Sequence, residues 1–370
     1  MPDVEVGRMN ILHLIHYAGS GGTEKYVLTL IRRQIAAGHT CTLVYGIEGP
    51  LVGDAAAAGA EVLQMPMRHI LDLKAARTLR GISRTREISV IHAHYPRENC
   101  IAILAKRMGL SAKVITTAHL VFACDAKWRV INRLFSPRNH AVLCVCEAQI
   151  DQLTKNGIRP DRLRVIHNGV PFDRVADPAR LRREIRAEFG IPEDAFVVTT
   201  LTRYEPVKGT DMLLETARLV QKRLPEARFL IAGQGSEFES ARETIKRYGM
   251  EGFFLQAGFR RDTDAILCAG DVSINTSRSE ALSFAITEAM SLSLPVVITK
   301  VGGNPEIVPT EADGGYLVPF GDAAAMADRL CRLSEDPALR ARMGAAAAER
   351  VRREFSEEVM YENIMKAYES

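Results

Sequence analysis

The sequence has no apolar run of the length that crosses a lipid bilayer. A spanning helix needs about 20 consecutive apolar residues, and no window of this chain approaches that length. The first residues, MPDVEVGRMNILHLIHYAG, also lack the basic region, apolar core and small-residue cleavage site of a signal peptide. We therefore expect a cytoplasmic protein.

Cysteine is scarce and its spacing is irregular. The seven cysteines are an odd number and lie scattered along the chain, which argues against a disulfide framework and for a reducing compartment. Cys144 and Cys146 share one face of a strand-like run, but no second pair follows at metal-ligand spacing. We interpret them as small core residues, with zinc ligation as the weaker alternative.

Neither sign of charge dominates the chain. Its 370 residues hold 48 Lys and Arg against 45 Asp and Glu, and no basic stretch is interleaved with aromatic residues. We therefore expect no nucleic-acid partner. The charge is uneven, however, because residues 1–172 hold 22 basic against 13 acidic residues. This is either a chance imbalance of solvated faces or a contact with something anionic, such as the inner face of a membrane or a lipid-linked phosphate.

Two segments are the candidates for that anionic contact. Residues 68–86 and 126–138 resemble amphipathic helices with basic rims and apolar stripes. Peripheral membrane association through the N-terminal half thus stays open beside a purely cytoplasmic location.

Short apolar strands alternate with helical segments from end to end. The expected strands fall in two series. The first comprises 10–18, 40–46, 60–65, 89–94, 112–119 and 140–146 and is ended by 161–173 with its Asn-Gly-x-Pro turn, and the second comprises 195–203, 227–235, 252–258, 271–275 and 294–299. Such alternation predicts an α/β protein with mainly parallel sheets covered on both faces. We place one doubly wound, Rossmann-like domain at 1–170 and a second at 171–354, facing each other across a cleft. Residues 355–370 form a helix that packs back toward the first domain.

Candidate ligand-binding turns follow the expected strands, where open parallel sheets bind their ligands. In AGSGGTEKYV (18–27), Gly21 and Gly22 would let an anion approach the start of a helix capped by Thr23. A tight turn that needs glycine explains this motif equally well. Its spacing is not Gly-x-Gly-x-x-Gly, and no acidic residue closes the second strand, so a nicotinamide site is not expected.

The second domain repeats this layout. Arg203 and Lys208 lie on the loop after its first strand, where two cations can clamp a diphosphate. Gly233 lies in a second strand–glycine–helix turn. Asp262 and Asp264 superficially resemble a metal-binding Asp-x-Asp, but helix N-capping is the better explanation.

Histidines gather on the strands of the first domain. His92 and His94 share one strand face, but metal ligation needs a third ligand that the sequence does not identify. His119 ends another strand and would point toward the cleft. A structural and a catalytic role explain it equally well.

The apolar segment RSEALSFAITEAMSLSLPVVIT (278–299) carries two carboxylates, Glu280 and Glu288. An unpaired buried charge is costly, so both need polar partners. We expect a loop entering a helix, with Glu280 before the first turn and Glu288 about two turns on. The N–H groups of Ala281, Leu282 and Ser283 would face an anion while the carboxylates accept hydrogen bonds from hydroxyls, which suits a sugar nucleotide.

These motifs together resemble the family-four retaining glycosyltransferases, nucleotide-sugar-dependent enzymes with the GT-B fold. The resemblance covers nearly the whole chain. It rests on AGSGGTEKYV, HNGV (167–170), Arg203 with Lys208-Gly209, GQGSE, Glu280 to Glu288, and VGGNPEIV (301–308). It implies an acceptor-binding first domain and a second domain that binds the nucleotide sugar.

The resemblance also implies roles for single residues. Arg203 and Lys208 would stabilise the leaving diphosphate, Glu288 would hold the ribose, and Glu280 would lie beside the transferred sugar. His119 would line the reaction centre. The other residues implied in donor binding are Gly21, Gly22, Gly233, Phe259, Arg260, Ala281, Leu282 and Ser283. Such enzymes typically need neither a tightly bound cofactor nor a metal.

We therefore predict a hexosyltransferase-type enzyme that moves a sugar from a nucleoside-diphosphate sugar, with UDP favoured, to a hydroxyl acceptor. The acceptor would be a glycan, a lipid-linked intermediate or a small molecule, as in cell-envelope polysaccharide or glycolipid synthesis. Ala281-Leu282-Ser283 stands where the family often has Gly-Phe-Gly, so sugar preference cannot be carried over. An epimerase or phosphorylase on the same fold and a non-catalytic sugar-nucleotide-binding module are the alternatives.

Overall fold

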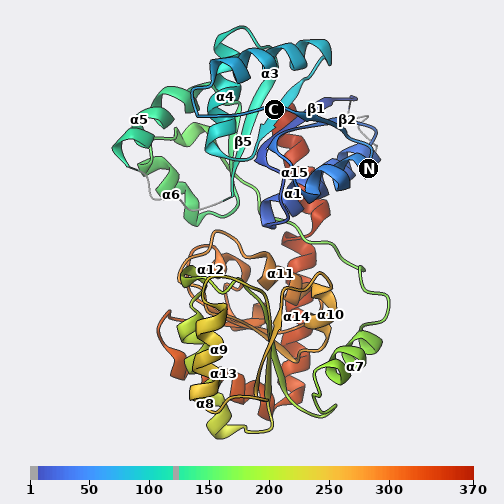
Figure 1. The fold of residues 1–370 in the computed structure, drawn as a ribbon, viewed down its shortest axis with the longest axis vertical. Coiled ribbons are helices and arrows are strands. Elements are labelled where there is room, and N and C mark those ends of the chain that lie inside the picture. The colour runs from blue at the N-terminus through green and yellow to red at the C-terminus, as the bar shows by residue number, and fades with distance from the viewer. Residues whose placement is uncertain (1–6, 120–124) are drawn as a thin grey trace. The chain divides into compact units, whose positions relative to one another are not determined.

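The computed structural model describes residues 7–119 and 125–370, and its chain divides into two compact units. Unit 1 comprises residues 1–168 and 357–370, and unit 2 comprises residues 169–356. Each unit contains one parallel β-sheet with helices packed against it (Figure 1). The α/β class and the parallel sheets predicted from the alternating pattern are confirmed.

The sheet of unit 1 has the spatial order β3-β2-β1-β4-β5-β6-β7, with every pairing parallel. Its strands are β1 (Asn10–Tyr17), β2 (Thr40–Ile47), β3 (Glu61–Gln64), β4 (Val90–Ala93), β5 (Lys113–Ala118), β6 (Ala141–Cys144) and β7 (Leu163–Val165). Its helices are α1 (Gly22–Ala36), α2 (Pro50–Ala57), α3 (Leu73–Thr85), α4 (Pro96–Arg107), α5 (Ala126–Phe135), α6 (Ala148–Lys155) and α15 (Glu357–Glu369).

The sheet of unit 2 has the order β10-β9-β8-β11-β12-β13 and is also parallel. Its strands are β8 (Val197–Leu201), β9 (Arg228–Ala232), β10 (Phe254–Gly258), β11 (Val272–Asn275), β12 (Val296–Thr299) and β13 (Gly315–Val318). Its helices are α7 (Pro178–Glu188), α8 (Thr210–Arg223), α9 (Phe238–Arg247), α10 (Thr263–Cys268), α11 (Phe284–Ser291), α12 (Asn304–Ile307), α13 (Ala323–Glu335) and α14 (Pro337–Glu354).

Both sheets are doubly wound. The strand order reverses direction between β1 and β4 in unit 1 and between β8 and β11 in unit 2. At such a switch point the loops that leave the two central strands diverge, and they open a crevice at the carboxyl edge of the sheet. Each unit therefore has one place where ligand-binding loops are expected to meet.

Apolar residues that alternate along the strands build a core on each face of the second sheet. Val197 packs with Ile266 of α10 on one face, whereas the next residue, Val198, packs with Leu213 of α8 and Met326 of α13 on the other. Cys144 and Cys146 are fully buried, which confirms their interpretation as small core residues. Within the described residues, no helix is both long and apolar enough to cross a membrane.

The last helix of the chain belongs to unit 1. Helix α15, drawn in red, lies beside the blue helix α1 (Figure 1). Arg33 of α1 forms ion pairs with Glu357 and Glu358 of α15. Tyr368, near the chain end, is buried at 1% exposure, so the end of the chain contributes to the core of the first unit.

Two local expectations differ from the structure. Strand β13 is not among the expected strands, because its four residues, GYLV, come directly after a turn at Gly314 and are too few to show a period. Thr23 does not cap α1, which begins at Gly22 with Gly21 in the cap position. The charged segment 178–188, which lies between the two expected strand series, forms α7.

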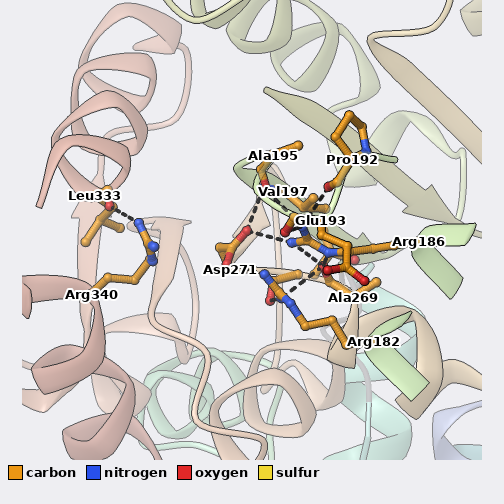
Figure 2. Close-up of polar contacts among 12 residues, drawn as sticks. Arg182, Arg186, Pro192, Glu193, Ala195, Val197, Ala269, Asp271, Leu333 and Arg340 are labelled. Atoms are coloured by element: carbon orange, nitrogen blue, oxygen red, sulfur yellow. Dashed lines mark hydrogen bonds and ion pairs between the residues drawn. The ribbon is translucent and has the colours of Figure 1, made fainter. Parts of the chain in front are cut away.

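Arg186 of α7 is the centre of a buried polar network (Figure 2). Its side chain is 2% exposed and pairs with Asp271 at 2.9 Å. The guanidinium also donates to the carbonyl oxygens of Ala269, Pro192, Glu193 and Ala195. Asp271 in turn accepts from the Val197 N–H at the start of β8. The network thus ties α7 to the central strands of the second sheet.

We predict that Arg186→Met strongly destabilises unit 2. Removing one partner of a buried ion pair leaves the other charge unpaired and costs about 3–5 kcal/mol, and the carbonyl acceptors lose their donor as well. Urea denaturation followed by circular dichroism measures the effect. Arg180→Met is the matched control, because Arg180 lies on the same helix in an exposed pair with Glu184, where a loss of less than about 1 kcal/mol is expected. Equal midpoints for the two variants would contradict this role of Arg186.

Candidate active site

The loops after β8 and β11 meet at the switch point of the second sheet. Lys208, on the loop after β8, places its Nζ 2.6 Å from Oε1 of Glu280, on the loop after β11. The same carboxylate oxygen accepts from the Ser277 hydroxyl at 2.6 Å and from the Asn275 amide at 3.4 Å. The Glu280 side chain is only 9% exposed. The partners that a nearly buried carboxylate requires are therefore these three groups.

A glycine turn packs closely against the backbone at Glu280. Gly302 has a φ of +50°, and a Cβ built on it would lie 1.7 Å from the Glu280 carbonyl oxygen. The N–H of Gly303 donates to the Ala281 carbonyl at 2.9 Å. Only glycine permits this approach, so the VGGN segment fixes where Glu280 sits.

Helix α11 begins later than the sequence suggests. Its first residue is Phe284 and its cap is Ser283, so Ala281 and Leu282 precede the helix, and of the three expected N–H groups only that of Ser283 belongs to the free amides of the helix start. Leu282 and Ser283 are buried. Glu288 lies half-buried on the helix, and its carbonyl accepts from Arg174 at 3.1 Å.

Arg203 and Gly233 lie on neighbouring loops of the same sheet edge. Arg203 is exposed and forms none of the ion pairs seen within the described residues. Gly233 has a φ of +145°, and a Cβ there would lie 1.6 Å from the Thr202 carbonyl oxygen. Glu205 accepts hydrogen bonds from the Ser236 N–H and hydroxyl, and these bonds lower the pKa of Glu205. The Glu205–Ser236 hydrogen bonds therefore join the loops after β8 and β9 and leave the Arg203 guanidinium available for a ligand.

The Asp-x-Asp pair is engaged by arginines. Asp262 occupies the cap position of α10 but makes no capping hydrogen bond, so the capping role expected for it is wrong. Its carboxylate pairs with Arg260 at 2.7 Å, and Arg260 also pairs with Glu188 at 2.5 Å, so the pKa of Arg260 is raised. Asp264 pairs with Arg174 at 2.8 Å. Neighbouring Phe259 is 66% exposed.

Unit 1 gathers its polar groups at its own switch point. Gly21 and Gly22 follow β1 and open α1. His92 and His94 lie in and just after β4 and are fully buried. His13 of β1 lies beside them, and one nitrogen of each of these three rings lies within 4.8 Å of the others. The third histidine that the sequence could not identify is therefore His13, which is 79 residues away in the chain from His92 but on the adjacent strand.

A cavity of about 500 Å³ lies next to this cluster, within unit 1. It lies at the carboxyl ends of β1 and β5 and just beyond β4, among α4, α5 and α6. Its wall is largely apolar, with Trp128, Phe135 and Ile158 among the residues. His119, Thr117 and Glu98 supply polar groups. A cavity of this size with few polar groups is typical of a small-molecule site.

Two family models match the chain in succession. The model described as Glycosyltransferase Family 4 matches residues 20–174, and the model described as Glycosyl transferases group 1 matches residues 182–350. Together they account for most of both units. The chain belongs to the family-four glycosyltransferases.

Curated relatives of this glycosyltransferase are similar over most of its length. It is 27% identical over 307 residues to N-acetyl-alpha-D-glucosaminyl L-malate synthase of Bacillus anthracis, covering 81% of this chain and 78% of that one. It is 26% identical over 291 residues to UDP-Gal:alpha-D-GlcNAc-diphosphoundecaprenol alpha-1,3-galactosyltransferase of Escherichia coli, covering 73% and 72%. The chain is accordingly an enzyme of the hexosyltransferase type.

Solved structures with the same fold include a glycosyltransferase from Rickettsia africae ESF-5, with a TM-score of 0.87, 20% identity and 98% of both chains covered. A second is Anabaena HepE in complex with UDP and glucose, with a TM-score of 0.85 and 20% identity over 98% of this chain and 100% of that one. These similarities confirm the GT-B fold of the glycosyltransferase.

Glu98 is a polar residue of the cavity that sequence reasoning did not select. It is fully buried at the start of α4, and its Oε1 accepts from the His16 N–H at 2.5 Å. Its Oε2 is buried without a hydrogen-bond partner among the described residues. Burial raises the pKa of Glu98 to about 7. A lone Glu near the start of a predicted helix reads as an ordinary first-turn residue, so no local signal distinguishes it.

We predict that Glu98 lowers the stability of the glycosyltransferase as pH rises. Its folded-state pKa lies above the ordinary value of 4.5, so the folded state holds a proton that the unfolded state has lost. Below about pH 4.5 both states hold the proton and the carboxyl group carries no penalty. As pH rises from there the unfolded state ionises first, so folding becomes progressively less favourable until pH passes 7 and both states have lost the proton. Relative to Glu98→Gln, the wild type should lose on the order of 2 kcal/mol between pH 5 and pH 8, as measured by denaturant titration. A pH-independent difference between the two proteins would refute the buried-acid assignment.

Proposed function

We propose that this enzyme transfers a sugar from a UDP-sugar to a hydroxyl acceptor, with retention of anomeric configuration and without a divalent metal. The observation that carries the proposal is the Lys208–Glu280 pair at the switch point of the second sheet. A cation and a hydrogen-bonded carboxylate side by side suit a ligand that has a phosphate next to a sugar hydroxyl. The UDP complex of HepE supports the choice of nucleotide.

Lys208 is suited to both groups at once. An ammonium has three N–H donors, and one of them is directed to Glu280. The others can bind the diphosphate, whose negative charge grows as the bond to the sugar breaks. Arg203, exposed on the same loop, would add a second cation. Fixed cations that face developing charge are the main catalytic term we propose.

Glu280 would accept a hydrogen bond from a hydroxyl of the transferred sugar. Its Oε1 is occupied by Lys208, Ser277 and Asn275, which leaves its second oxygen to meet the ligand. Glu288 would hold the ribose, Ser283 and the preceding backbone would meet phosphate, and Phe259 with Arg260 would lie near the base. Gly21, Gly22 and Gly233 would give the ligand close access to the backbone.

Metal independence is supported by the state of the Asp-x-Asp pair. Asp262 and Asp264 each form an ion pair with a different arginine. A cation there would have to displace both arginines, so these carboxylates are poor candidates for holding a metal-bound diphosphate.

We predict that Lys208→Met lowers kcat/KM for transfer about 100-fold. The substitution removes a charge that stabilises the leaving diphosphate, an effect on the order of 3 kcal/mol, while it keeps the length of the side chain. Arg242→Met is the matched control, because Arg242 lies in the same unit in an exposed pair with Glu239. Turnover is measured with UDP-sugars, and proton NMR of the first-formed product gives the anomeric configuration.

Several results would contradict this mechanism. Wild-type rates in Lys208→Met would show that Lys208 is not the catalytic cation. A product with inverted anomeric configuration would show that the enzyme is not retaining. Conversion of the donor without an acceptor would indicate an epimerase. A requirement for inorganic phosphate would indicate a phosphorylase.

We also propose a lipid-linked acceptor reached by peripheral contact with an anionic membrane. Helix α5 supports this, because Val130 and Leu134 are each 54% exposed and Arg129 and Arg133 lie on the same short helix. Exposed apolar side chains flanked by basic ones are typical of helices that lie at a membrane surface.

We predict that the protein sediments with phosphatidylglycerol vesicles at low salt and not with phosphatidylcholine vesicles. Arg129→Gln with Arg133→Gln should weaken binding about 30-fold, because each basic residue near an anionic surface contributes about 1 kcal/mol. Arg242→Gln, in the other unit, should bind as the wild type does. A wild-type protein that ignores anionic vesicles at low salt would exclude this contact.

A further inference from the structure

Gln34 of α1 lies at the end of a continuous chain of hydrogen bonds inside unit 1. His13 Nε2 lies 2.8 Å from Gln34 Oε1, and His13 Nδ1 lies 3.1 Å from His94 Nε2. His94 Nδ1 lies 3.3 Å from His119 Nε2. We call these four residues, Gln34, His13, His94 and His119, the histidine chain. It runs from a helix on the sheet to the wall of the cavity.

The imidazoles of the histidine chain are neutral at physiological pH. Burial lowers the pKa of His13 to about 4 and that of His119 to about 3, and it lowers the pKa of His94 well below the ordinary value. A charged ring here would lose its hydration and repel the next ring. Each ring therefore carries a single N–H, on one of its two nitrogens.

A chain of neutral rings can donate in one direction only. His13 and His94 use both of their nitrogens in the chain, so each ring donates to one neighbour and accepts from the other. Once the proton of one ring is placed, the protons of the other two follow. The positions of these protons therefore depend on the end of the histidine chain at which the neighbouring groups are defined donors and acceptors.

Gln34 is that end. Its Oε1 lies 3.2 Å from the Cys41 thiol, which is a donor, and its Nε2 donates to the Tyr368 hydroxyl. This orientation of the amide presents an acceptor to His13, so His13 carries its proton on Nε2. His94 and His119 then carry theirs on Nε2 as well. Tyr368 continues a separate branch to His92 Nδ1 at 2.7 Å, and His92 Nε2 meets Thr117 at 2.7 Å.

We propose that Gln34, acting through His13 and His94, is a positioning residue that keeps a bare Nδ1 on His119 for a substrate hydroxyl in the cavity. Within residues 7–119 and 125–370, this is the one ring nitrogen of the histidine chain that the chain itself does not use. The rings of Tyr26 and His119 pack in a T-shaped arrangement with their centroids 4.7 Å apart, which helps to fix the plane of His119. The tautomer follows from the orientation of the Gln34 amide, whereas the use of Nδ1 by a substrate rests on the proposed function.

The same histidines could be taken for a metal site, because nitrogens of His13, His92 and His94 lie within 4.8 Å of one another. Both nitrogens of each of these rings are, however, already hydrogen-bonded to protein groups at 2.7–3.3 Å. A metal ion would have to break at least three of these bonds. The hydrogen-bond chain is therefore the better description of the cluster.

Nitrogen-15 NMR of ring-labelled histidine tests the tautomer directly. Long-range proton–nitrogen correlations distinguish an Nε2–H ring from an Nδ1–H ring, and single His→Gln variants assign the signals. We expect His13, His94 and His119 as neutral Nε2–H rings throughout pH 6 to 8. A His119 ring with its proton on Nδ1 would overturn the proposal, and so would a stoichiometric metal bound to the purified protein at His13, His92 and His94.

Gln34→Met separates the positioning role from simple packing, because methionine keeps the length of the side chain and removes the acceptor. His119 should then populate both tautomers, and kcat/KM for transfer should fall about 10- to 100-fold, as is typical when the partner that orients a functional histidine is removed. Tyr361→Phe is the matched control. Tyr361 lies on α15, which packs beside α1, and the change removes a hydroxyl outside the histidine chain. The His119 tautomer should then be unchanged, and kcat/KM should stay within about twofold of the wild type.

The NMR measurement of the tautomer and the measurement of kcat/KM test two separate parts of the proposal. An unchanged His119 tautomer in Gln34→Met, or an equal loss of activity in both variants, would overturn the role of Gln34. If wild-type protein transferred no sugar from any donor, the proposed function would fail and with it the role of Nδ1 toward substrate. The NMR measurement would still decide whether Gln34 sets the tautomer of His119.

Discussion

The cost of burying a carboxylate at the carboxyl edge of a parallel sheet is the constraint on which the second unit depends. Glu280 is nearly buried because the loop after β11 folds under the VGGN turn. It is tolerated there because Lys208, Ser277 and Asn275 converge on one of its oxygens. The lysine comes from the loop after β8, and these two loops meet only because the strand order reverses between β8 and β11. The Lys208–Glu280 ion pair therefore depends directly on the strand order of the sheet.

Unit 1 satisfies its buried polar groups in another way. Its histidines remain neutral, and they replace the lost contact with water by hydrogen bonds to one another and to Gln34. A network of this kind has a direction, which a cluster of ion pairs does not have. The cavity beside it is bordered by His119. Which nitrogen of His119 carries the proton is determined by Gln34, through His13 and His94. Glu98, on the same cavity, has no partner for its Oε2 among the described residues and holds its proton to an unusually high pH.

A buried charge by itself does not indicate a functional site, and Arg186 shows why. It is more deeply buried than Lys208 and pairs with a carboxylate, that of Asp271. Its five N–H donors, however, are directed to backbone carbonyls and to this single carboxylate, and none of them is left for a ligand. Arg203, by contrast, is exposed on a loop at the sheet edge. The distinction lies in unused hydrogen-bonding capacity at a switch point rather than in burial.

The sequence by itself determined the α/β class, nearly all of the strands and the positions of Glu280, Glu288, Lys208 and Arg203 on loops or helices. These features follow from periodicity and from turn residues, which act over a few positions along the chain. Tertiary structure alone decided which groups meet. Lys208 and Glu280 are 72 residues apart, and His13 and His94 are 81 residues apart. Asp262 turned to Arg260 instead of capping its helix, and the charged helix around Arg186 became core. A hydrogen bond depends on distance in space, and only the folded sheet sets that distance.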